Sequence, residues 1–198
     1  MRFRDLRPLA VPLIMLAAIN GLWEPVIFGW AAASPDHFNA NVAPNSNMID
    51  DCRTALFILM VLLFIGWLYQ AGRNLVAAGY DDLEFTPASR IWWFAVPVAA
   101  LFVPFQARRE LWNVSHGIFP HDRDHALLYG WWALHLIKSF AAVAFAFAVG
   151  SNSAFAAGQW WMTGTLDLAV AVPSILVVIG ITRAQMRFRH PTLAEDFT

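Results

Sequence analysis

Four ionisable side chains lie inside otherwise apolar stretches of this 198-residue chain. They are Glu24, His135, Lys138 and Asp167. An ionisable group at the centre of a membrane span costs at least about 2.5–3.5 kcal/mol, so residues of this kind are functional candidates. Lys138 is the only lysine in the chain, and a lysine side chain extends several ångströms along a helix.

The two acids and the lysine lie at similar depths if their stretches are helices that cross a bilayer. At about 1.5 Å per residue, Glu24, Lys138 and Asp167 lie roughly 23, 17 and 24 Å from the cytoplasmic ends of their helices. An ionic cluster is therefore predicted, either as a salt bridge that fixes helix register or as a relay for protons or ions. The alternative is that both acids are exposed at the outer interface. His135 shares a helix side with Lys138. It is a weak candidate for axial ligation of a haem or chlorin and more typically a packing residue.

A second group of candidate ligands occurs in the sequence SHGIFPHDRDH. Its members are His116, His121, Asp122, Asp124 and His125. Imidazole and carboxylate groups suit zinc or iron. The spacing matches no known metal motif, and the proline with alternating charges favours a solvated loop, so metal binding is the less favoured interpretation. The sequence also has no nucleophile elbow, zinc-protease helix, phosphate loop or dinucleotide fingerprint. We therefore lean against an enzyme and expect no cofactor.

The composition indicates the environment in which these groups lie. Hydrophobic residues make up 59% of the chain and charged residues only 14%, with ten tryptophans and sixteen phenylalanines. Soluble domains are about half apolar and a quarter charged. The formal charge of −1 argues against a nucleic-acid partner, and a single cysteine excludes an internal disulfide. The chain is predicted to be an all-α polytopic membrane protein, with a single membrane domain over residues 1–198.

Four stretches are long enough to cross about 30 Å of hydrocarbon, which takes about 20 helical residues. They are residues 9–32, 54–77, 127–149 and 163–183. A fifth apolar stretch, 91–105, is only about 15 residues long and contains Pro97 and Pro104, and a proline removes a helix hydrogen bond. This fifth stretch is predicted not to cross the membrane. A short amphipathic helix, suited to a membrane surface, is predicted over about 104–115.

The distribution of basic residues predicts the topology. If 91–105 enters and leaves the membrane on one side, one face of the protein holds eleven basic residues and the other holds only Arg53, in the first loop. If it crosses, the asymmetry disappears. The positive-inside rule therefore favours four crossings, a cytoplasmic re-entrant or interfacial segment at 91–105, and both termini in the cytoplasm. The first span is expected to be an uncleaved anchor.

The stretch 67–115 resembles a family of bacterial multi-spanning membrane proteins known only as a domain of unknown function. The principal matching positions are Trp67, Asn74, Pro87, Trp93, Pro97, Pro104, Gln106, Glu110, Trp112 and Ser115. The chain departs from the family pattern at Ala100, in place of an asparagine, and at Arg90, in place of a small residue. The resemblance implies a location in the bacterial inner membrane and supplies no activity.

These observations favour a non-enzymatic accessory, scaffold or regulatory subunit that acts through helix contacts in the membrane. Its expected partners are the lipid bilayer and other membrane proteins or a second copy of itself, without nucleic acid. The first alternative is a small ion- or proton-coupled transporter that uses Glu24, Lys138 and Asp167. The second alternative is a membrane enzyme that binds a cofactor or a metal.

Overall fold

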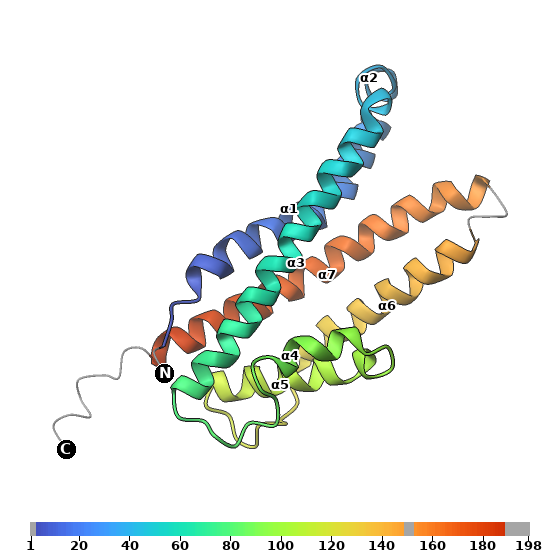
Figure 1. Cartoon of the computed structure of the whole chain (residues 1–198). Coiled ribbons are helices and arrows are strands. Elements are labelled where there is room, and N and C mark those ends of the chain that lie inside the picture. The colour runs from blue at the N-terminus through green and yellow to red at the C-terminus, as the bar shows by residue number, and fades with distance from the viewer. Residues whose placement is uncertain (1–2, 149–152, 189–198) are drawn as a thin grey trace. The chain divides into compact units, whose positions relative to one another are not determined.

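The computed structural model describes residues 3–148 and 153–188, and this part of the chain consists of helices and loops without a strand (Figure 1). The prediction of an all-α fold is confirmed. The α-helices are α1 (Arg7–Ala33), α2 (Pro35–Asn41), α3 (Ser46–Ala77), α4 (Ser89–Trp92), α5 (Val103–Ser115), α6 (Ala126–Ala148) and α7 (Ser153–Phe188). Three short 3-10 turns complete the order: η1 (Ala43–Asn45), η2 (Trp93–Ala95) and η3 (Ala99–Leu101).

Four segments of the described chain are long and apolar enough to cross a membrane, as predicted. They are Arg7–Ala33, Pro35–Ala77, Ala126–Phe145 and Met162–Arg187. Residue 149, the predicted end of the third span, and Arg189 of the C-terminal tail lie outside the described residues. The structure differs from the expectation at Arg53, which lies within α3 rather than in a loop. No proline or glycine occurs between Ser46 and Thr54, so the helix extends beyond its apolar part.

The long helices expose apolar side chains in continuous stripes. On α1 the exposed residues recur every three or four positions: Val11, Met15, Ile19, Leu22, Val26 and Trp30. Helical residues at this spacing share one face. An exposed apolar stripe of this length is suited to contact with lipid acyl chains. It is therefore consistent with the span-like length and composition of these helices.

The predicted interruption at 91–105 is present. The chain passes through the end of α4, the turns η2 and η3, and the first residues of α5, with Pro97 between the two turns. No helix in this segment is long enough to span a membrane. Its apolar side chains are strongly exposed, with fractions of 71% for Trp92, 73% for Val98 and 61% for Phe102.

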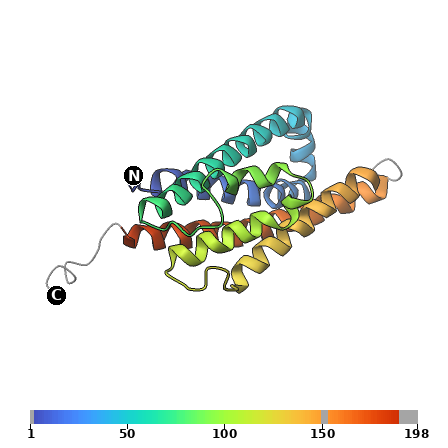
Figure 2. The same cartoon turned by 60° about the horizontal axis from the view of Figure 1, so that its bottom comes forward.

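The chain forms two compact units. Unit 1 comprises residues 1–13, 62–129 and 176–198, and unit 2 comprises residues 14–61 and 130–175. Helices α1, α3 and α7, which Figure 2 shows from a second side, each contribute residues to both units. Of the eleven Lys and Arg residues in the described ranges, unit 1 holds all except Arg53 and Lys138.

Helix α5 lies in unit 1 and is largely buried. Its bounds, Val103–Ser115, match the predicted helix at 104–115. Nine of its 13 residues are buried, including the charged residues Arg108 and Glu110. Protein therefore covers most of this helix, and its location at a membrane surface stays a prediction.

Candidate functional site

A buried polar network in unit 1 is centred on Asn74 of α3, whose exposed fraction is 0%. The side-chain oxygen of Asn74 accepts hydrogen bonds from the backbone N–H of Arg4 at 3.0 Å and from Gln70 Nε2 at 3.0 Å. Its side-chain nitrogen donates to the carbonyl oxygen of Arg4 at 2.9 Å and to Gln185 Oε1 at 3.1 Å. One amide thus joins the segment before α1 to α3 and α7.

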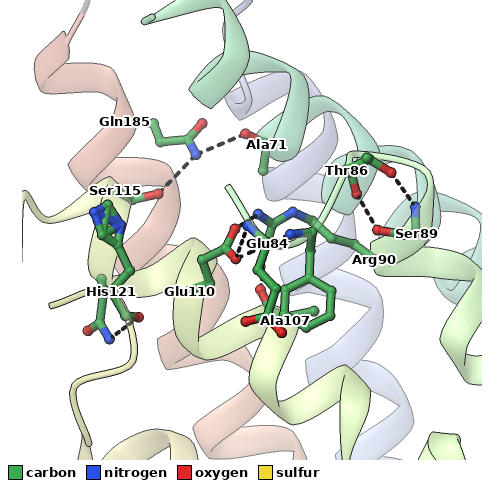
Figure 3. A network of polar contacts seen from close by, with 12 residues as sticks. Ala71, Glu84, Thr86, Ser89, Arg90, Ala107, Glu110, Ser115, His121 and Gln185 are labelled. Atoms are coloured by element: carbon green, nitrogen blue, oxygen red, sulfur yellow. Dashed lines mark hydrogen bonds and ion pairs between the residues drawn. The ribbon is translucent and has the colours of Figure 1, made fainter. Parts of the chain in front are cut away.

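Gln185 of α7 extends this network to α5. Its Nε2 donates to the carbonyl oxygen of Ala71 at 3.1 Å and to Ser115 Oγ at 3.0 Å, as Figure 3 shows. Nearby, the indole nitrogen of Trp67 donates to Thr182 Oγ1 at 3.1 Å. Every amide buried in this way needs hydrogen-bond partners, because an unsatisfied buried group costs about 1–3 kcal/mol. The network therefore fixes the relative placement of α3, α5 and α7 within unit 1.

A buried ion pair between Arg90 and Glu110 forms the second half of the unit 1 site (Figure 3). The Arg90 guanidinium donates to Glu110 Oε1 at 2.5 Å and also to the carbonyl oxygen of Ala107. The other carboxylate oxygen, Oε2, accepts from the backbone N–H groups of Glu84 at 3.0 Å and Phe85 at 3.2 Å. Burial lowers the pKa of the Arg90 guanidinium, and the charge of Glu110 opposes that shift. Because Arg90 bonds to Ala107 and Glu110, the two ends of the segment 91–106 lie next to each other.

Close packing surrounds this ion pair. A Cβ at Gly72 would lie 3.1 Å from Pro87 Cα, so the glycine lets the loop that carries Pro87 approach α3. The guanidinium of Arg108 lies 4.6 Å from the centre of the Phe64 ring. Burial lowers the pKa of Arg108 to about 9, and the nearby charge of Arg90 adds to this shift. A guanidinium with this pKa is still charged at neutral pH.

Nine of the ten family-motif residues divide into two groups, and the tenth, Pro87, is half-buried beside Gly72. Buried members pack or bond inside unit 1: Trp67, Asn74, Pro104, Glu110, Trp112 and Ser115. By contrast, Trp93 and Gln106 are exposed, and Pro97 lies in the interrupted segment. The sequence did not indicate Gln70, Thr182 or Gln185 as members of the network. Gln185 lies beyond the predicted span, where a polar residue looks like part of a solvated tail.

The histidine-rich segment packs against Trp112 rather than forming a ligand set. The rings of His116 and His125 lie with their centres 4.3 Å and 4.8 Å from the Trp112 indole. The backbone carbonyl of His121 accepts from Asn113, and Asp124 accepts from Tyr129 and pairs with Arg109; Asp122 is exposed. Within residues 3–148 and 153–188, no three His, Cys, Asp or Glu residues gather as a metal-binding group.

His135 of α6 lies among aromatic rings in unit 2. Its ring centre is 5.4 Å from Trp132 at an interplanar angle of 15°, and 6.0 Å from Trp131. Trp131 in turn donates its indole N–H to Ser174 Oγ at 3.0 Å. These stacked contacts are those of a packing residue, and they give no specific support to a haem or chlorin ligand.

Unit 2 joins the predicted intramembrane charges through an additional residue. Arg53 of α3 donates to Glu24 of α1 and, at 3.2 Å, to Asp167 Oδ2 of α7. Lys138 of α6 pairs with the other carboxylate oxygen of Asp167. The exposed fractions of Glu24 and Asp167 are 4% and 8%. The four charges form one chain, in which Arg53 rather than Lys138 bridges the two acids.

Two glycines let α1 and α7 approach each other beside these charges in unit 2. A Cβ at Gly21 would lie 2.5 Å from the Ala171 Cβ, and one at Gly164 would lie 3.0 Å from the Glu24 Cβ. An open hollow of about 410 Å³ adjoins the charged chain. It is lined by Asn20, Asp50, Arg53, Thr54, Phe57 and Asp167. Two members of the ionic chain, Arg53 and Asp167, therefore line the hollow.

The described part of the chain is thus a helical protein with four helices long and apolar enough to cross a membrane. A family model described as "Domain of unknown function (DUF4328)" matches residues 46–184, and the chain belongs to that family. This match confirms the resemblance found over 67–115. No curated protein and no solved structure matches the chain.

Proposed function

We propose that this protein is a non-enzymatic accessory, scaffold or regulatory subunit of a bacterial inner membrane. The observation that carries the proposal is that the polar motif side chains buried in unit 1 form hydrogen bonds to other residues of that unit. Asn74, Glu110 and Ser115 are bonded to neighbouring helices and loops inside unit 1. A catalytic group must instead reach its substrate at hydrogen-bond distance. These contacts support a rigid platform whose outer surfaces contact lipid and other proteins.

The platform is proposed to hold 91–105 as a re-entrant segment. Arg90 bonds to Ala107 and Glu110, so the two ends of this segment lie next to each other. This arrangement suits a segment that enters and leaves the bilayer on the same side. Residues 91–107 carry no charge, and Trp92 and Val98 are exposed. Irregular backbone at membrane depth needs protein or water to satisfy its polar groups. We propose that α5, which follows this segment in the chain, supplies part of that cover. Nine basic residues of the described chain lie in unit 1, and under the positive-inside rule this distribution supports a cytoplasmic location of both termini.

Reporter fusions in living bacteria test this topology. Alkaline phosphatase is active only outside the cytoplasm, and green fluorescent protein folds well inside it. We expect fluorescence without phosphatase activity for fusions after Ser115, and the reverse pattern for fusions after Asn41 of α2. Phosphatase activity after Ser115 would contradict the re-entrant arrangement.

Photo-crosslinking in native membranes tests the accessory role. Helix α6 carries small residues between its exposed side chains, which permits close approach of another helix. A photoreactive residue at Val143, 55% exposed, is expected to form a discrete protein adduct. The matched control at Leu128 of the same helix, 0% exposed, should form none. A purified protein that stays monomeric, together with no adduct at Val143, would exclude this role.

A second candidate function is ion- or proton-coupled transport. The specific observation in its favour is the chain Glu24–Arg53–Asp167–Lys138, because buried charges that meet an open hollow are typical of ion pathways. In proteoliposomes, Lys138→Met should abolish a pH-dependent flux while the protein stays folded. Destabilisation without a flux in the wild type would instead leave the charges as a structural salt bridge.

A further inference from the structure

We propose that the hollow in unit 2 binds a small organic cation that carries an ammonium group. The hollow lies beside α1, α3 and α7, within one compact unit of the structure. Its volume of about 410 Å³ falls in the roughly 300–1,000 Å³ range of small-molecule sites. Its polar groups determine the class of ligand.

Two residues that line the hollow, Arg53 and Asn20, donate hydrogen bonds to other residues of the protein. Arg53 donates to Glu24 and Asp167, and the side-chain N–H of Asn20 donates to the carbonyl oxygen of Leu16 at 2.9 Å. The amide oxygen of Asn20 is left to accept. Asp50 is exposed and forms no ion pair with any residue in the described ranges. A ligand therefore meets carboxylate and amide acceptors, to which the Thr54 hydroxyl adds a third. An ammonium group supplies three donors.

The sum of the charges in and beside the hollow also favours a cationic ligand. The acids in and beside the hollow are Glu24, Asp50 and Asp167, and the bases are Arg53 and Lys138. The sum is one net negative charge, which a monovalent cation neutralises. Opposite charges attract more strongly where protein and lipid lower the local dielectric constant. An anion would be repelled by the unpaired carboxylate of Asp50.

The aromatic ring of Phe57, which lines the hollow, favours an organic cation over a metal ion. Phe57 lines the hollow with 49% of its surface exposed. A ring face attracts ammonium groups and packs against their attached carbons. Within the part of the chain that the structure describes, no group of three acidic, histidine or cysteine ligands is present for a divalent metal. The acceptors and the ring together suit a small amine.

This binding site does not depend on the accessory role. If the second candidate function is correct, the hollow is its substrate site, but binding itself requires no transport. A binding experiment therefore tests the inference separately from any flux measurement.

The test uses the purified full-length protein in lipid nanodiscs with ethanolamine hydrochloride as the probe. Binding is followed as a saturable rise in Tm by circular dichroism at 222 nm, since a ligand that binds only the folded state stabilises it. Sodium chloride and sodium acetate at equal ionic strength are the salt controls. We expect a saturable rise with ethanolamine and none with either salt.

Two neighbouring acids provide a matched pair of variants. Asp50→Asn should raise the Kd for ethanolamine at least tenfold, which is about 1.4 kcal/mol. Asp51→Asn makes the same charge change at an exposed residue that does not line the hollow, and it should leave Kd within about twofold. Phe57→Leu should weaken binding by a smaller factor. The proposal is wrong if ethanolamine gives no saturable shift, if sodium chloride gives the same shift, or if the two Asn variants bind alike.

Discussion

Replacing Glu110 by glutamine tests whether the Arg90–Glu110 ion pair holds unit 1 together. The exposed fractions of the two side chains are 0% for Arg90 and 8% for Glu110. Glutamine keeps an oxygen for the backbone N–H groups of Glu84 and Phe85 but removes the negative charge. The Arg90 cation is then buried without a counter-charge. Breaking a buried pair by removing one partner costs about 3–5 kcal/mol, so Glu110→Gln should destabilise the protein by this amount.

A double variant separates the ion pair from the packing around it. Arg90→Met combined with Glu110→Gln removes the uncompensated cation and keeps similar side-chain volumes. Replacing both members of a buried ion pair is often neutral, so the double variant should regain most of the lost stability. The double variant should therefore be more stable than Glu110→Gln alone.

Thermal unfolding in detergent by circular dichroism measures this difference. For a chain of this length, about 3–5 kcal/mol corresponds to a fall in Tm of roughly 6–20 °C. Limited proteolysis of the 78–88 loop reports the local effect, because Glu110 binds the backbone of that loop. A Glu110→Gln protein as stable as the wild type, or a double variant less stable than the single one, would refute the reasoning.

Three further substitutions test the other contacts. Asn74→Ala removes the amide that bonds the N-terminal segment to α3 and α7, and it should cost about 2–3 kcal/mol in thermal unfolding. Gly180→Ala places a Cβ 2.5 Å from the Trp112 ring and should cost about 1–3 kcal/mol; a double-mutant cycle should show a smaller loss when Trp112→Phe is present. Asp167→Asn leaves two cations without their shared acceptor, so it should lower Tm further than Lys138→Met, which leaves Asp167 paired.

The four long helices could be predicted from the sequence because membrane-span length and apolar composition are local properties of a chain. Their approximate bounds and the interruption near Pro97 follow from residue types alone. The N-terminal end of α3 could not be placed in this way, since the polar residues before Thr54 resemble a loop. They form helix because no proline or glycine stops propagation from the apolar part. This difference of two turns is what brings Arg53 to Glu24.

Pairing between distant residues was the part that sequence reasoning could not supply. Their similar depths predicted that Glu24, Lys138 and Asp167 form one cluster, but a depth gives only the position of a residue along its helix axis. Which charges meet also depends on helix rotation. The close approach at Gly21 and Gly164 brings α1 against α7 in unit 2, and Arg53 bridges their two carboxylates.

The resemblance to the family implies a small residue at position 90, where this chain has Arg90. Glu110 is a motif residue, and its carboxylate makes two kinds of contact here. It accepts hydrogen bonds from two backbone N–H groups, and it neutralises the charge of Arg90. The first kind of contact needs only acceptor oxygens close to the 84–85 backbone, and it would be unchanged with a small residue at position 90. The ion pair with Arg90 connects α4 to α5 and keeps the two ends of the segment 91–106 close together. In this protein, Arg90 thus adds a buried ion pair to the hydrogen bonds between Glu110 and the preceding loop. The segment that carries Trp92 and Val98 is accordingly held at both ends by buried groups while its middle exposes only uncharged residues.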